Sequence, residues 1–160
     1  MSDQRFKTIR HIETVRNYLN EVIRELLYRA EQHDQSKLES PEKEMFDKYT
    51  EKLRGMTYGS EEYKACMAEM SKNALGHHYA HNRHHPQHHP NGIKDMHLID
   101  IVEMFFDWYS ATKRHHDGNI YRSIEINQKR DGYSDDIRQI FKNTADWIEA
   151  RKVFHHAEES

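Results

Sequence analysis

The chain has 160 residues, a formal net charge of -3 and one cysteine, Cys66. This length suits one domain with its own core, the lack of a long basic run argues against binding along a nucleic-acid backbone, and a lone cysteine excludes an internal disulfide framework. The sequence also lacks an apolar stretch of membrane-spanning length and the apolar segment of a signal peptide. We therefore expect a single-domain cytoplasmic protein over residues 1–160, with no membrane partner and no extended nucleic-acid partner.

Apolar residues recur at helical spacing through most of the chain, and no alternating strand pattern occurs. The first such segment, residues 5–32, contains neither Gly nor Pro. Only Asn17 and Asn20 hint at a break that would divide this segment into two helices. Ser40 and Ser60 are suitable N-caps for the next two helices.

The third helix should end near His84, because Pro86 disfavours helical geometry at the residue before it. Asp95 can cap the next helix, which Gly118 then ends. Two further helices are expected within residues 119–156. The sequence therefore predicts an all-α helical bundle of six or seven helices.

Residues 77–89, HHYAHNRHHPQHH, hold seven of the fourteen histidines of the chain. Because this cluster lies in mid-chain between two helical segments, an internal metal site is the leading hypothesis, and a solvated histidine-rich loop is the alternative. Helical spacing divides the cluster into one face with His78, Asn82 and His85 and another with His77, His81, His84 and His88. The turn imposed by the following proline can also carry both His84 and His85 inward.

A second candidate metal-binding motif is His33-Asp34, with Lys37 three residues later. Adjacent histidine and aspartate side chains at a turn present one nitrogen and one hard oxygen ligand, a mixture that suits divalent iron, manganese, cobalt, zinc or nickel. The dipeptide is weak evidence alone and gains weight from His11 upstream and the histidine cluster downstream. The helix after the cluster adds three carboxylates on one face, Asp100, Glu103 and Asp107.

The order of these motifs resembles the HD-domain phosphohydrolase superfamily. The resemblance is carried by His11, by His33-Asp34 with Lys37 in the form HDQSK, by the His84-His85 pair and by a late aspartate. The motifs HDQSK, HHYAHNRHHPQHH and EMFFDWYSA also resemble an uncharacterised family of short bacterial and phage proteins that carry HDxSK, NxHHPxH and EMxxDW. This second resemblance is more specific and covers residues 8–114.

The superfamily resemblance implies an HD-like fold and metal ligation by seven candidates, His11, His33, Asp34, His78, His84, His85 and Asp107. Asp107 is preferred over Asp100 because an apolar helical run follows it, as in the superfamily. Ligation by His11 carries a condition: a straight helix would hold it about 33 Å from His33, so the first helix must break or His11 is not a ligand. One or two divalent ions are expected, Fe, Mn, Co, Ni or Zn, with Mg left open.

The expected activity is hydrolysis of a phosphoester by a metal-activated water, with a nucleotide as the favoured small-molecule substrate. Lys37 is expected near the substrate phosphate, and Glu103, or Asp100, orients the water or takes its proton. Further substrate contacts are expected from Asn82, Arg83, His88 and Arg114. Three alternatives stay open: a non-catalytic metal-stabilised binding module, a helical interaction protein without metal, and a metal-dependent hydrolase of another bond. Homo-oligomerisation is also left open.

Overall fold

The computed structural model describes residues 4–57, 59–70, 75–114 and 117–158 of the chain. This part forms α-helices and no strand, so the predicted all-α architecture is confirmed. None of the described helices is both long and apolar enough to cross a membrane. The helices are α1 (Gln4–Gln32), α2 (Glu42–Arg54), α3 (Glu61–Met70), α4 (Gly76–His81), α5 (Leu98–Thr112), α6 (Ile120–Asp131) and α7 (Asp135–Glu158). Short 3₁₀ helices, η1 (Gln35–Leu38), η3 (Pro86–His88) and η4 (Gly92–Asp95), lie between them.

The two serines expected to cap helices behave differently. Ser60 is confirmed as a cap, since its Oγ accepts a hydrogen bond from the Tyr63 amide at 3.1 Å. The prediction for Ser40 is wrong, because α2 begins one residue later than expected, with Pro41 in the N-cap position and no side-chain cap. The first helical residue is therefore Glu42, whose side chain turns into the interior and is fully buried.

The start of α5 also differs from the prediction. His97 occupies the N-cap, where its ring accepts from the Asp100 amide while the Asp100 carboxylate accepts from the His97 amide. Asp95, the expected cap, instead lies at the end of η4, and its carboxylate accepts a hydrogen bond from the Asn91 amide at 3.0 Å. At the other end α5 stops at Thr112, before the glycine that was expected to end it.

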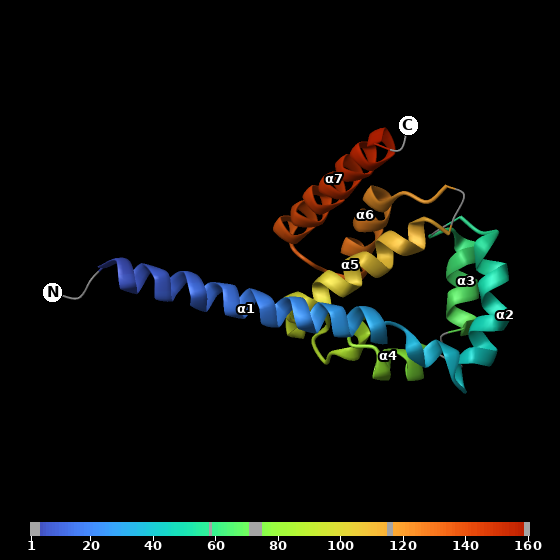
Figure 1. Cartoon of the computed structure of the whole chain (residues 1–160). Helices are drawn as coiled ribbons and strands as arrows, with labels where there is room; N and C mark the ends of the chain where they lie inside the picture. Colours follow the sequence, from blue (N-terminus) through green and yellow to red (C-terminus); the bar gives the residue numbers. More distant parts are fainter. Residues whose placement is uncertain (1–3, 58, 71–74, 115–116, 159–160) are drawn as a thin grey trace.

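Two apolar clusters hold the helices together. In Figure 1, α5 lies between α1 and α6, both of which it contacts. The larger cluster joins α5, α6 and α7 through Met104, Phe105, Trp108, Tyr109, Ile120, Ile124, Tyr133, Phe141 and Ala145. The smaller joins α2, α3 and the start of α4 through Tyr49, Cys66, Met70 and Leu75. The core thus draws on apolar residues of α5, α6 and α7, whereas Leu98, Ile140 and Trp147 on two of these helices are more than half exposed.

α1 is one continuous helix of 29 residues, without a break at Asn17 or Asn20. Its C-terminal part packs against α5 through Arg29, whereas its N-terminal part extends beyond the rest of the molecule (Figure 1). No residue of α1 is buried, and apolar side chains such as Tyr18 and Leu27 are more than 60% exposed. Because only the C-terminal part of α1 packs against α5, only residues near that end can take part in a site formed with the other helices.

Candidate metal centre

The backbone turns sharply where α1 ends. Asp34 adopts left-handed dihedral angles, φ 57° and ψ 17°, which short polar side chains tolerate better than branched ones. As a result, His33 and Asp34 both face the space between α4 and α5. His33 Nε2 lies 3.4 Å from Asp34 Oδ2 and 3.8 Å from Asp107 Oδ1 of α5.

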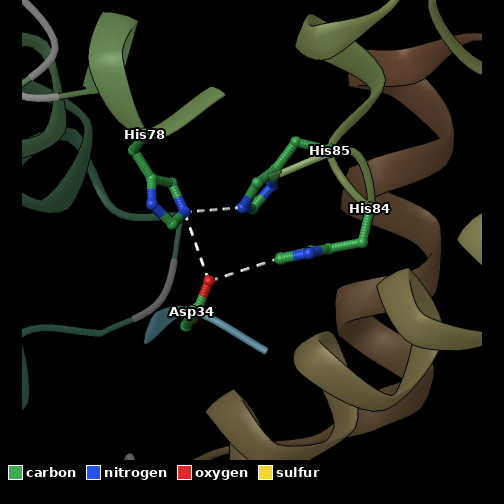
Figure 2. Close-up of side chains that lie close together, drawn as sticks. All are labelled: Asp34, His78, His84 and His85. Carbon is green, nitrogen blue, oxygen red and sulfur yellow. Dashed lines mark hydrogen bonds and ion pairs between the residues drawn. The ribbon is translucent and has the colours of Figure 1, made fainter. Parts of the chain in front are cut away.

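The histidine cluster approaches the same space from the other side. α4 ends at His81, earlier than predicted, and the chain then becomes extended, because a proline follows His85. This exit from the helix turns two consecutive histidines inward, and His78 on α4 meets them. His78 and His84 are 2% and 1% exposed. Figure 2 shows the three imidazoles of His78, His84 and His85 gathered around the carboxylate of Asp34.

The spacing of these four side chains fits a metal ion. Asp34 Oδ1 lies 3.5 Å from His78 Nε2 and 3.6 Å from His84 Nε2, and the Nε2 atoms of His78 and His85 are 2.8 Å apart. One ligand atom from each residue lies within 4.8 Å of all the others. Metal–ligand bonds of about 2.0–2.1 Å place neighbouring ligand atoms roughly 2.8–3.4 Å apart, so only small movements would be needed to coordinate one ion.

Two buried atoms at this place have no hydrogen-bond partner among the described residues. They are Asp34 Oδ1 and His84 Nε2, which face each other across the 3.6 Å gap. A buried polar atom without a partner costs about 1–3 kcal/mol, so such atoms are usually satisfied by water or an ion. A carboxylate oxygen and an imidazole nitrogen, both acceptors, would be satisfied together by a cation. The residues present therefore fit a metal ion.

Buried carboxylates hold the histidine rings from behind. His78 Nδ1 lies 2.9 Å from Glu42 Oε2, while His84 Nδ1 and His33 Nδ1 lie 3.0 and 2.9 Å from Glu103 Oε1. For His78 and His84, this network assigns the proton to Nδ1, which donates to the carboxylate, and leaves the Nε2 lone pair directed at the centre. Metal-binding histidines in proteins are commonly oriented in this way.

Asn82 belongs to this supporting network and not to the substrate contacts for which it was proposed. Its amide donates to Ser36 Oγ at 2.7 Å and to the His78 carbonyl at 2.9 Å. Ser36 Oγ in turn donates to Glu42 Oε2 at 2.9 Å, and His77 Nδ1 lies 2.6 Å from the other oxygen of Glu42. Asn82 is 8% exposed and serves to fix the carboxylate that orients His78.

A second group of potential ligands lies on the opposite side of Asp34. It consists of His33, Asp34 and Asp107, and its contact with Asp34 is through Oδ2, whereas the first group uses Oδ1. A carboxylate placed in this way could bridge two ions. Lys37, however, makes a very short contact with the same Oδ2, so its ammonium group supplies positive charge at this second position.

The pKa values follow this division of charge. The carboxylates of Asp107 and Glu103 raise the pKa of His33 to about 10, which makes it a cation in the metal-free protein. Burial alone would raise the pKa of Glu103 and of Asp107, but the adjacent His33 and other neighbouring positive charge outweigh burial and lower both pKa values. His33 and Lys37 together therefore balance these carboxylates without a second ion.

Two histidines of the first group have pKa values that are shifted in the opposite direction, downwards. Burial, and then the adjacent His84 and His78, lower the pKa of His85 to about 2, and burial followed by the charge of Lys37 lowers the pKa of His78. Both rings are neutral at pH 7, which is the form that binds a metal. Of the two groups, Asp34, His78, His84 and His85 are thus the better prepared to bind a metal ion.

The structure does not bring His11 to this centre. His11 lies on the exposed, continuous part of α1, about 33 Å from His33 along a straight helix. Its inclusion among the ligands is therefore wrong, since the break in the helix that ligation required does not occur. The other six proposed ligands all belong to the two groups described above, which share Asp34.

The carboxylates of Glu103 and Asp100 both form ion pairs with arginines. Arg29 of α1 donates to Glu103 Oε2 at 2.9 Å and to Asp100 Oδ1 at 3.1 Å. Arg83 donates to both oxygens of Asp100, at 2.9 and 3.1 Å. Since the other oxygen of Glu103 accepts from histidines, Glu103 positions ligands and is not free to take a proton as predicted. Arg83 is likewise committed to Asp100, so its expected role in binding substrate is not supported.

A cavity of about 410 Å³ opens beside the centre and is lined by His78, His85, Asp107 and Lys37. Of the four residues predicted to bind substrate, only Arg114 lines this cavity. His88 is directed elsewhere, with Nδ1 2.8 Å from the Tyr79 carbonyl. The centre therefore borders an open cavity.

Two important residues escaped the sequence analysis, Glu42 and Arg29. The available signal for Glu42 was a pair of acids in the first turn of α2, but Glu44 in the same turn is exposed. Helical periodicity could not separate the two, because the inward turn depends on how α2 packs against α4. Arg29 is one of several basic residues of α1, and the sequence does not separate it from the others. Only its ion pairs with α5 do so.

Comparison with known proteins identifies a family but no activity. The chain belongs to DUF5662, a family of unknown function whose model matches residues 1–150. No curated protein and no solved structure matches the chain. The function must therefore be inferred from the centre itself.

Proposed function

We propose that this member of DUF5662 is a metal-dependent phosphohydrolase that binds one divalent transition-metal ion through Asp34, His78, His84 and His85. The observation that carries the proposal is the buried pair of unpartnered acceptors, Asp34 Oδ1 and His84 Nε2, at a group of ligands that borders a cavity. Three imidazoles and one carboxylate suit iron, manganese, cobalt, nickel or zinc better than magnesium, which prefers oxygen ligands.

A divalent ion held there would lower the pKa of a bound water and draw charge from a phosphate oxygen. The chain's own residues prepare the rest. His78 and His84 are held by Glu42 and Glu103 in the orientation that directs Nε2 at the centre. Lys37, next to Asp34 and at the cavity wall, offers an ammonium group to the charge that develops on a phosphate under attack.

A phosphoester of a small molecule suits this site better than a polymer. The cavity volume of about 410 Å³ lies in the range typical of small-molecule pockets, roughly 300–1,000 Å³. The order of the motifs, HDQSK followed by the histidine cluster and Asp107, supports assignment to the HD-domain phosphohydrolases as part of the same proposal. A nucleotide remains the favoured substrate.

The proposal is tested on protein purified without a polyhistidine tag, by elemental analysis and by phosphate release from a nucleotide panel with Mn, Co, Ni and Mg. We expect near-stoichiometric metal and metal-dependent phosphate release. Asp34→Asn should lose the metal and lower kcat/KM at least 100-fold, since asparagine tolerates the left-handed backbone but carries no charge. Absence of phosphate release from every substrate, or release that survives in Asp34→Asn, would refute it.

His81→Gln is the matched control within the histidine cluster. His81 is exposed, stacks on His77 and belongs to none of the ligand groups. Its substitution should leave metal content and activity at the level of the unmodified protein. Equal losses in Asp34→Asn and His81→Gln would mean that the histidine cluster binds metal without the proposed selectivity.

A non-catalytic, metal-stabilised module is the second candidate. It is favoured by the number of ligands, because four protein ligands can complete a tetrahedral site with no open position, as in structural zinc sites. The two candidates differ in one result. Stoichiometric metal in a protein that releases no phosphate under any condition of the panel supports the module.

A further inference from the structure

The cavity beside the metal centre has an unequal distribution of charge. Its lining includes Lys37, Asp107 and two of the proposed ligands, His78 and His85. An apolar wall is contributed by both clusters and includes Phe46, Leu53, Met67, Met70, Tyr79 and Trp108. The lining also contains three arginines, Arg54, Arg114 and Arg130.

These arginines come from three separate places in the chain: the end of α2, the segment after α5 and the end of α6. Arg130 donates to both carboxylate oxygens of Asp131, at 2.8 Å each. Within the described part of the chain, the side chains of Arg54 and Arg114 form no hydrogen bond or ion pair with another residue. Two guanidinium groups are therefore available at one small cavity.

No acidic residue of the cavity wall is available to neutralise them. The acids in the lining are Asp47 and Asp107. Asp47 accepts a hydrogen bond from Lys43 at 2.5 Å, and Asp107 lies at the metal centre beside His33. An arginine fork without a protein counter-ion, next to an apolar wall, is suited to bind a carboxylate or phosphate of a ligand.

We propose that the cavity takes a phosphoester with two anionic groups, joined by an aromatic or apolar body. One phosphate lies at the metal centre beside Lys37, the body packs on the apolar wall, and the second group, a carboxylate or another phosphate, is bound by Arg54 and Arg114. This inference rests on the proposed hydrolase function. In the reaction, water adds to phosphorus, the bond from phosphorus to the ester oxygen breaks, and the alcohol leaves with a proton while the second anionic group stays unchanged.

The test compares substrates that differ only in the second anion. Phenyl phosphate is paired with 4-carboxyphenyl phosphate, and adenosine 5′-monophosphate with adenosine 3′,5′-bisphosphate, all with the metal-loaded full chain. We expect kcat/KM to be at least tenfold higher for the second member of a pair. The carboxylate and phosphate arms tell which anion is preferred, since each pair reports on one of them.

The variant that isolates the effect is Arg54→Gln with Arg114→Gln. Both side chains are exposed and outside the apolar clusters, so the fold should be retained, and a thermal melt checks this. The ratio of kcat/KM within each pair should fall to about one. Arg122→Gln, an exposed arginine that does not line this cavity, should keep the ratio of the unmodified protein.

The outcomes separate the two proposals. If no substrate releases phosphate, the hydrolase function fails and the inference fails with it. If phosphate is released but the ratio is close to one in the unmodified protein, or is unchanged in the double variant, the hydrolase stands and the second anion site is overturned.

Discussion

At the scale of single residues, the centre depends on carboxylates that hold histidines in place. Glu42 is fully buried, and its two oxygens are shared by His77, His78 and Ser36. Burial alone would raise its pKa, but the hydrogen bonds from both histidines lower it, so Glu42 remains ionised. A buried charge of this kind is tolerated because its hydrogen-bonding partners surround it.

Replacement of Glu42 by glutamine should therefore weaken metal binding without removing a ligand. The amide keeps the shape of the side chain but cannot accept from both rings, so His78 loses its fixed orientation. Loss of such a supporting group typically lowers metal affinity about 10–100-fold. Competition with a chelating dye measures the change, and Glu44→Gln, in the same turn but exposed, should match the unmodified protein.

His33 should make the metal-free protein sensitive to alkaline pH. Its pKa is raised from 6.5 to about 10 by Asp107 and Glu103, so the charged ring stabilises the folded state. This contribution is complete below pH 6.5 and is lost as the pH rises towards 10. Urea unfolding of chelator-treated protein should show a difference in free energy between the unmodified chain and His33→Gln that shrinks from pH 6 to pH 10. A constant difference would contradict this account.

At the scale of the secondary-structure elements, α5 connects the core to the centre. One side of it carries Phe105 and Trp108 of the larger cluster, and another carries Glu103 and Asp107. Its N-terminus is held by a capping box, and its last residue, Thr112, is closely approached by Gly118. A substitution at either end of α5 should therefore affect both the metal centre and the stability of the fold.

Gly118→Ala tests the connection between α5 and α6. An added Cβ at this position would lie 1.8 Å from the carbonyl oxygen of Thr112 and 2.7 Å from its carbonyl carbon, so the backbone must shift. We expect destabilisation of about 1–3 kcal/mol, the usual range for an overpacked site, measured by urea unfolding. Gly76→Ala is the control, since nothing lies within 4 Å of its Cβ and alanine favours the helix by about 0.5–1 kcal/mol. Equal effects of the two substitutions would contradict the steric argument.

At the scale of the whole molecule, the centre lies where the two apolar clusters meet. Trp108 of the larger cluster and Met70 and Leu75 of the smaller one line the same cavity. The four proposed ligands come from the turn after α1, from α4 and from the loop after α4, and Asp107 of α5 lies beside them. An ion at this point would add a link between these segments to those that already join them, such as the hydrogen bond from Asn82 to Ser36.

Removal of the metal should therefore lower the melting temperature of the protein. A ligand present at 100 times its Kd stabilises the folded state by about 2.7 kcal/mol, which corresponds to roughly 5–10 °C for a chain of this size. Differential scanning calorimetry with and without a chelator measures the shift. Asp34→Asn, which should bind no metal, is expected to melt at the same temperature in both conditions.

The sequence by itself determined the helical architecture and most of the ligand types. Helical periodicity predicted the all-α fold, and the motifs around His33-Asp34 and the histidine cluster pointed to six residues that the structure brings together. Local patterns suffice for these features because periodicity reports which face of a helix is apolar, and a proline restricts the residue before it. The same patterns could not decide whether the first helix breaks and brings His11 to the centre.

Only the tertiary structure decided which polar side chains support the centre. Glu42 and Glu44 are equivalent in the sequence, and helical spacing places Asp100, Glu103 and Asp107 on one face, where only the family resemblance favoured Asp107. Packing of α2 against α4 buried Glu42, and packing of α1 against α5 placed Arg29 between Asp100 and Glu103, which left Asp107 at the centre. The physical reason is that the role of an acid depends on its neighbours in space, and these neighbours lie about seventy residues away in the chain.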